Sequence, residues 1–180
     1  MLKRFIAKTA LFVWYGTAWL VCSLLPAPAP RRANPSGNLV VTGAFHNPGW
    51  FVSHATPLGR CGFRQVIVVT HGELPAVPGV TLDSPPRWLT VLTGRAVSKL
   101  IWTIRVGFRS NADLMMGFHI LPNSIIALIA GRLLRRPTCY QMTSGPVELI
   151  GGGYLSWENP ILRGLGGPSP FLERLALAVA

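Results

Sequence analysis

Short runs of β-branched residues alternate with longer segments of helical periodicity from residue 38 to the end of the sequence. The clearest run is Gln65–Thr70, which is continuously apolar between its polar ends, as in a strand that is covered on both faces of a parallel sheet. Strands that alternate with helices form right-handed βαβ units. The sequence therefore predicts an α/β fold with a parallel sheet.

The same patterns place the individual elements. Strands are expected at Leu39–Thr42, Gln65–Thr70, Val80–Leu82, Asp113–Gly117 and Thr138–Met142. Helices are expected at Trp50–Arg60 with a bend at Pro57, at Arg87–Phe108, from Asn123 or Ser124 as the capping residue to Arg136, and from about Phe171. The expected architecture is a Rossmann-like parallel sheet flanked by helices, in which ligands bind beyond the carboxyl ends of the strands.

An apolar segment precedes the sheet region. The stretch Thr9–Leu25 has no charged residue, follows Lys3, Arg4 and Lys8, and ends at Pro26–Pro30 and Arg31. It is short for a membrane span, which needs about 20 apolar residues, and it also fits a helix lying in the membrane interface or a secretory signal. We therefore divide the chain into residues 1–37, a membrane-contacting N-terminal apolar helix with a proline-rich linker, and residues 38–180, the Rossmann-like domain.

The charge of the chain is strongly positive, with 17 Lys and Arg against 6 Asp and Glu. Such a field attracts anionic lipids, phosphate-bearing substrates or nucleic acid. No nucleic-acid-binding motif is present, so nucleic acid is not expected, whereas an anionic membrane surface is a possible partner. Cys22, Cys61 and Cys139 are widely spaced, which predicts no disulfide framework, no metal site and a cytoplasmic protein. We expect residues 2–25 to associate it with the inner face of the membrane.

Three stretches near the predicted strand ends carry a resemblance to a known family. They are Gly49–Leu58 leading into Val66–Thr70, Asp113–Leu134 with its histidine at the end of a strand, and Arg136–Gly145. Over roughly residues 38–180 the chain resembles the N-terminal domain of family 4 glycosyltransferases of the type B fold. Gly43–Gly49 departs from the family's usual glycine pair, and Ser144–Glu148 departs from its usual histidine-glycine motif.

The resemblance implies two Rossmann-like domains, of which the N-terminal one binds most of the acceptor and the C-terminal one most of the nucleotide-sugar. It implies that this chain is the N-terminal half of a hexosyl- or glycosyltransferase, incomplete at its C-terminus and inactive alone as a fragment. Joined to a second domain, it would transfer a sugar from a nucleotide-sugar donor to a hydroxyl of a sugar or lipid-linked acceptor. The nucleotide-sugar is a substrate, and the resemblance implies no cofactor and no metal.

Two alternatives belong to other functional classes. The chain could be a non-catalytic, membrane-associated α/β binding module that lacks the second domain, which the length of the reading frame beyond Ala180 would distinguish. It could also be another nucleotide-sugar-modifying α/β enzyme. A dinucleotide-binding enzyme of that kind would carry a GxGxxG fingerprint after Thr42, and the sequence has none there.

The candidate site residues follow the predicted strands. His119 is the candidate catalytic residue, although a histidine at a strand end can also simply bind a loop carbonyl. Glu148 is a candidate acceptor-binding carboxylate or general base, or else the partner of an arginine. Asn47 can instead stabilise a turn, and Trp50 can instead pack in the hydrophobic core. His71 is assigned no function. The expected substrate-binding residues are His46, Asn47, Gly49, Trp50, Ser53, Asn123, Thr143, Ser144, Gly145 and Glu148.

Overall fold

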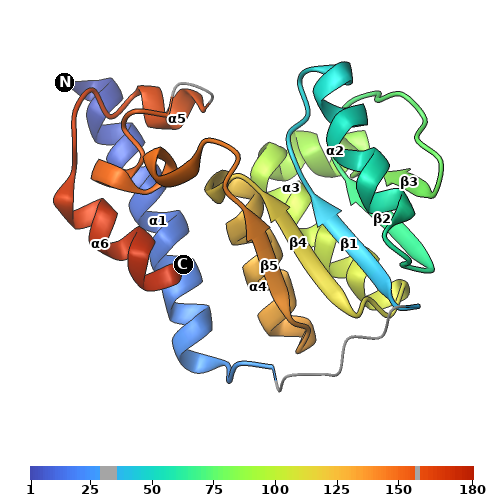
Figure 1. Ribbon diagram of the computed structural model, residues 1–180. Helices are drawn as coiled ribbons and strands as arrows, with labels where there is room; N and C mark the ends of the chain where they lie inside the picture. Colours follow the sequence, from blue (N-terminus) through green and yellow to red (C-terminus); the bar gives the residue numbers. More distant parts are fainter. Residues whose placement is uncertain (29–35, 157–158) are drawn as a thin grey trace.

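The computed structural model describes residues 1–28, 36–156 and 159–180. Its centre is a five-stranded parallel sheet with the strand order β3-β2-β1-β4-β5 (Figure 1). The strands are β1 (Asn38–Thr42), β2 (Gln65–Val69), β3 (Val80–Asp83), β4 (Leu114–Phe118) and β5 (Thr138–Gln141). Because β1 pairs with both β2 and β4, the strand order reverses at β1, and the α/β Rossmann-like fold class is confirmed.

Helices cover both faces of the sheet because the strand side chains alternate between two apolar clusters. Leu39 and Val41 of β1 face α2 (Pro48–Arg60), whose Phe51 is fully buried. Val40 faces the opposite way, toward α3 (Arg87–Arg109) and α4 (Ile125–Leu134). This two-sided burial is the reason that the strands are apolar without a polar face.

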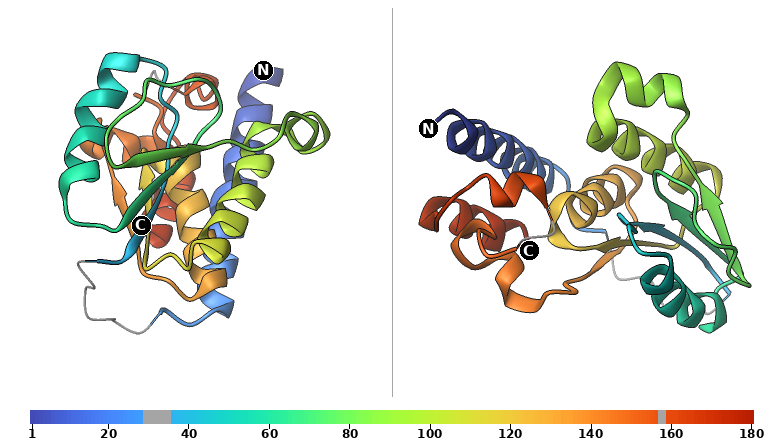
Figure 2. Two further views of the ribbon diagram at one scale, coloured as in Figure 1. Left: turned by 90° about the vertical axis from the view of Figure 1, so that its right-hand side faces the viewer. Right: turned by 90° about the horizontal axis from the view of Figure 1, so that it is seen from above.

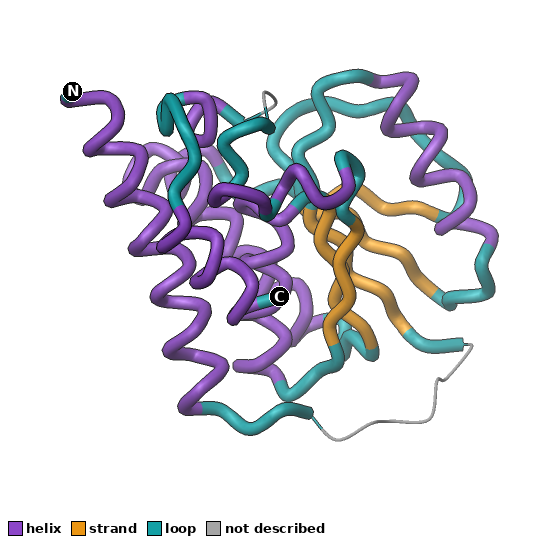
Figure 3. The backbone as a smooth tube through the Cα atoms, turned by 60° about the vertical axis from the view of Figure 1, so that its left-hand side comes forward, coloured by secondary structure: helices purple, strands orange, loops and turns teal. Residues whose placement is uncertain are grey.

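The N-terminal helix α1 (Leu2–Leu24) packs against the rest of the chain rather than standing apart. Its Leu11, Tyr15 and Ala18 share a buried cluster with residues of the turn η1 (Ile120–Ser124), α4, α5 (Pro160–Arg163) and α6 (Pro170–Val179). Figure 1 shows α1 running beside α6 on the side of the molecule away from β3, and in Figure 3 the helix that begins at the N-terminus again lies beside the one that ends at the C-terminus.

The remaining face of α1 is apolar and exposed, with Phe5, Phe12 and Trp19 among its uncovered side chains. By length and composition α1 is the one helix of the described residues that could cross a membrane, and it is apolar enough to associate with one. Arg31 and the end of the proline-rich linker fall within residues 29–35, outside the described residues.

Several helix boundaries differ from those expected. Helix α2 begins at Pro48, because the Asn47 side chain accepts hydrogen bonds from the amides of Gly49 and Trp50, and it continues through Pro57. Helix α3 is kinked at Gly94, whose φ of 77° lies in a region that glycine adopts readily, so its first two turns project from the molecule (Figure 2).

Neither Asn123 nor Ser124 caps α4 with its side chain, contrary to the expectation from sequence. The Ser124 hydroxyl donates to the carbonyl oxygen of His119 instead, and the Asn123 amide oxygen accepts a hydrogen bond from Lys99. Both side chains therefore bind partners outside the first turn of α4, and the turn η1 leads directly into this helix.

Candidate functional site

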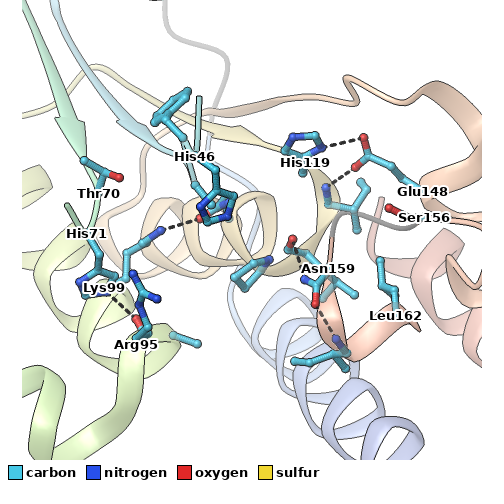
Figure 4. A pocket seen from close by; sticks show the side chains of 18 residues that line it. His46, Thr70, His71, Arg95, Lys99, His119, Glu148, Ser156, Asn159 and Leu162 are labelled. Atoms are coloured by element: carbon cyan, nitrogen blue, oxygen red, sulfur yellow. Dashed lines mark hydrogen bonds and ion pairs between the residues drawn. The ribbon is translucent and has the colours of Figure 1, made fainter. Parts of the chain in front are cut away.

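A cavity of about 390 Å³ opens at the carboxyl ends of β1, β2 and β4, next to the reversal of strand order (Figure 4). Its walls come from the loops after these strands, from α3, from the turn η1 and from parts of residues 148–162. Open parallel sheets bind their ligands at such a place, because the loops diverge there. The cavity is therefore the candidate functional site.

His119 and Glu148 lie in contact on one wall, and they form an ion pair when the histidine is protonated. The Oε1 atom of Glu148 lies 3.2 Å from Nδ1 of His119. Glu148 is 3% exposed, and its carboxylate also accepts hydrogen bonds from the backbone amides of Ile120, at 2.6 Å, and Ser144, at 3.0 Å. Glu148 therefore contacts a histidine and two amides, and the arginine partner that we considered from sequence is not the one it has.

These contacts decide the charge of Glu148. Burial pushes the pKa of its carboxyl upward, but the hydrogen bonds from His119 and from the two amides outweigh burial, so the pKa lies below its ordinary value. Glu148 is consequently ionised at neutral pH, which suits a group that orients a histidine better than a general base.

The backbone at His119 is strained. Its φ of 63° with ψ of 147° lies outside the regions that a residue with a Cβ normally adopts. The amide and the hydroxyl of Ser124 both donate to the carbonyl oxygen of His119, and its own amide donates to Gln141. Strained residues held by several contacts concentrate at functional sites, and the side chain of His119 lines the cavity.

The opposite wall carries positive charge. Lys99 is 5% exposed, and its Nζ donates to the carbonyl oxygen of Gly43 at 2.8 Å and to Oδ1 of Asn123 at 3.0 Å. Burial, and then the charge of Arg95 one turn earlier in α3, lower the pKa of Lys99 to about 8. His71 lies beside them, with Nε2 2.8 Å from the Arg95 carbonyl oxygen, and burial lowers its pKa.

Comparison with known proteins identifies no family for this chain. No protein-family model matches the chain, and no curated protein matches it. Two crystal structures of the C-terminal domain of a hydrogenase from Pyrococcus furiosus are similar at 14% sequence identity, with TM-scores of 0.42 and 0.43. They are matched over 99% of their own length and cover 64% and 65% of this chain. Likeness at this level carries no argument about function.

The cavity brings together some of the predicted residues. His46, His119, Asn123 and Glu148 line it. Thr143 and Ser144 stand behind the His119–Glu148 pair: the Thr143 hydroxyl lies 2.6 Å from Nδ1 of His119, and the Ser144 amide donates to Glu148.

The other predicted residues lie outside the walls of the cavity. Asn47 caps α2 and engages the amide of Gly49, and the Ser53 hydroxyl donates to the Trp50 carbonyl. The Trp50 ring stacks on the His119 ring, with centroids 5.8 Å apart, and thereby supports the site from behind. Gly145 begins the short helix η2 (Gly145–Glu148) with a φ of 66°, which fits a residue without a Cβ.

The candidate residues chosen from the sequence did not include Lys99, Arg95, Thr70 and His71, all of which line the cavity. The apolar residues at helical spacing in this segment, such as Ala96 and Leu100, leave Arg95 and Lys99 on other faces of the expected helix, whereas Lys99 is buried in the structure. Their spacing of four residues, which puts both on one helix face, was the available signal. Within residues 1–28, 36–156 and 159–180, no group of three or more His, Cys, Asp or Glu side chains is arranged to hold a metal ion.

Proposed function

We propose that the chain is the acceptor-side, N-terminal half of a glycosyltransferase that works joined to a second, donor-binding domain. The observation that carries the proposal is the pairing of His119 with the buried Glu148 on the wall of a cavity at the carboxyl ends of β1 and β4. In the resemblance drawn from the sequence, a strand-end histidine approaches the transferring sugar, and His119 occupies the corresponding place at the end of β4.

The proposed reaction joins an acceptor hydroxyl to the anomeric carbon of a nucleotide-sugar. The acceptor oxygen bonds to that carbon, the bond from the carbon to the diphosphate breaks, the diphosphate leaves with the electron pair, and the hydroxyl proton is released. His119 contacts the transferring sugar, and Glu148 is a positioning residue that fixes the imidazole through its contact at Nδ1. The proposal includes no cofactor and no protein-bound metal.

The membrane association in this proposal rests on helix α1. One face of the helix packs on α4 and α6 through Leu11 and Tyr15, while the face with Phe12 and Trp19 remains apolar and exposed. A helix that is held along its length by its own domain fits the membrane interface better than a span. We place the chain in the cytoplasm at the inner face of the membrane, where an anionic surface attracts its basic residues and a lipid-linked acceptor is in reach.

The test uses the natural gene product that contains these residues. Sugar transfer from a panel of radiolabelled nucleotide-sugars to membrane lipids and free sugars is measured for the parent protein and for His119→Ala. We expect His119→Ala to lower kcat by roughly 100-fold, the loss typical of one group that stabilises the transition state. Glu73→Gln is the matched control, because Glu73 is an exposed acid outside the cavity.

Glu148→Gln tests the positioning role. It keeps the shape of the side chain but removes the charge that holds His119, so we expect kcat to fall with little change in KM and the pH profile of kcat to shift. Absence of transfer with every donor, or full activity of His119→Ala, would refute the proposed function.

A further inference from the structure

The wall opposite His119 and Glu148 carries three buried hydrogen-bond donors with unused capacity. Lys99, Asn123 and Thr70 are 5%, 0% and 1% exposed, and all three line the cavity. Neither Nδ2 of Asn123 nor Oγ1 of Thr70 has a hydrogen-bond partner within the part of the chain that the structure describes. Figure 4 shows Thr70, Lys99, Arg95 and His71 gathered on this side and Glu148 on the other.

The orientation of Asn123 is fixed by its neighbour. Because the Lys99 ammonium can only donate, the Asn123 atom that it contacts at 3.0 Å is the amide oxygen. The amide nitrogen, with two N–H groups, is therefore the part of Asn123 that remains unsatisfied. Among the described residues, the hydrogen-bond partners of Lys99 are two neutral oxygens, those of Gly43 and Asn123.

Such an arrangement is unfavourable without a ligand. A buried ammonium that faces neutral oxygens is poorly compensated, and each buried donor without an acceptor adds the cost of its lost hydration. Arg95 adds a second positive charge close enough to act on Lys99. The two ion pairs among the described residues are Arg109–Asp83 and His119–Glu148, so no acid there neutralises Lys99 or Arg95.

We propose that this wall binds a phosphoryl group of the substrate, with Lys99, Asn123 and Thr70 as inner donors and Arg95 and His71 at the mouth. The two positive charges call for an anion, and donors from the loop after β2, from α3 and from η1 suit the several acceptor oxygens of a tetrahedral phosphate better than a planar carboxylate. That the phosphoryl group belongs to a sugar-transfer substrate rests on the proposed function.

The cavity then has two ends with separate tasks. The Lys99 end holds the phosphoryl group, and the His119 end receives the reacting part of the substrate. Two sources of this chemistry exist in sugar transfer: a phosphate carried by the acceptor, or the diphosphate of the donor. The basic wall belongs to the same chain as the proposed acceptor side, and competition between ligands distinguishes the two sources.

The experiment measures binding of inorganic phosphate to the chain of residues 1–180 by isothermal titration, at constant ionic strength and with acetate as the carboxylate probe. Variants are Lys99→Met, Thr70→Val and Arg95→Met. Arg60→Met is the matched control, because Arg60 is exposed on α2 and does not line the cavity. Circular dichroism checks that each variant folds, and Thr70→Val keeps the test decisive should Lys99→Met unfold.

We expect phosphate to bind the parent protein and Arg60→Met alike, and acetate to bind more weakly. Removing the Lys99 ammonium raises the Kd for phosphate by roughly tenfold or more, the loss of one charge-assisted hydrogen bond, and Thr70→Val and Arg95→Met raise it less. No phosphate binding, binding that is equal in Thr70→Val, Arg95→Met and the parent, or a preference for acetate overturns the proposal.

Competition then identifies the source. Displacement of phosphate by a hexose phosphate assigns the phosphoryl group to the acceptor, and displacement by a nucleoside diphosphate assigns it to the donor; either result supports the proposal. Displacement by neither reduces the site to that of an adventitious ion and overturns it. Because phosphate binding is measured without transfer, a gene product that binds phosphate and transfers no sugar refutes the proposed function alone.

Discussion

Replacing Lys99 by Met changes the way in which the stability of the chain depends on pH. The ammonium of Lys99 has a pKa of about 8 in the folded chain against its ordinary value of 10.5, and burial is the main cause. Each unit of such a shift corresponds to about 1.4 kcal/mol, so keeping this lysine charged in the fold costs about 3 kcal/mol of unfolding free energy.

The direction in which pH changes the stability depends on how many protons each state binds. Between the folded pKa of about 8 and the unfolded pKa of 10.5, the unfolded chain binds more protons at Lys99 than the folded chain does. Stability therefore rises with pH through this window. The cost is fully present below pH 8 and is lost as the pH rises through 10.5. Met at this position carries no such cost, since its side chain does not titrate.

Denaturant unfolding of both proteins in a phosphate-free buffer with a nonionic detergent measures the effect. From about pH 7 to about pH 10, we expect the unfolding free energy of the parent to rise by about 2–3 kcal/mol relative to Lys99→Met. Loss of the two hydrogen bonds to Gly43 and Asn123 adds a constant offset, which leaves the slope unchanged.

The neighbours of Lys99 do not produce the same slope. His71, whose pKa is lowered by burial, is neutral over the whole window. Glu148, whose pKa is lowered by its hydrogen bonds, is ionised over the whole window. Lys8→Met, which removes an exposed lysine of α1, is the control. Parallel stability curves for the parent and Lys99→Met over this pH range would refute the claim that Lys99 is a buried, charged side chain.

Three further outcomes test the fold around the site. Gly117→Ala places a Cβ 2.3 Å from the backbone of the turn after β4 and should lower the unfolding free energy by about 1–3 kcal/mol in denaturant titrations, whereas Gly16→Ala, with open space around it in α1, should not destabilise the chain. Asn47→Ala removes the cap of α2 and should cost about 1 kcal/mol in the same assay; an unchanged midpoint would contradict the capping role. Trp19→Ser should weaken binding to anionic vesicles in a flotation assay while Val52→Ser on α2 should not, and equal flotation of the two would argue against α1 as the membrane-contacting helix.

The local elements were predictable because their signals are local. β-branched runs such as Gln65–Val69 form strands wherever both faces can be covered. The alternation of strands with helices then predicts a parallel sheet. The place of the candidate site was predictable as well, since the carboxyl ends of the neighbouring strands β1 and β4 lie together where the strand order reverses. His119 was identified from its position at one of these ends.

The partners of the site residues were not predictable, because they come from distant parts of the chain. Lys99 contacts Gly43, 56 residues away, and Asn123, 24 residues away, and helical periodicity says nothing of either. Glu148 finds His119 across 29 residues, although arginines far outnumber histidines in the sequence.

The sequence by itself determined the α/β class, the order of the elements, the apolar character of residues 2–25 and the edge of the sheet where the cavity opens. Only the tertiary structure decided that Lys99 is buried, that Glu148 holds His119 and that one face of α1 packs on α4 and α6. The physical reason is that periodicity depends on neighbours along the chain, whereas burial and charge pairing depend on which elements come to lie against each other in space.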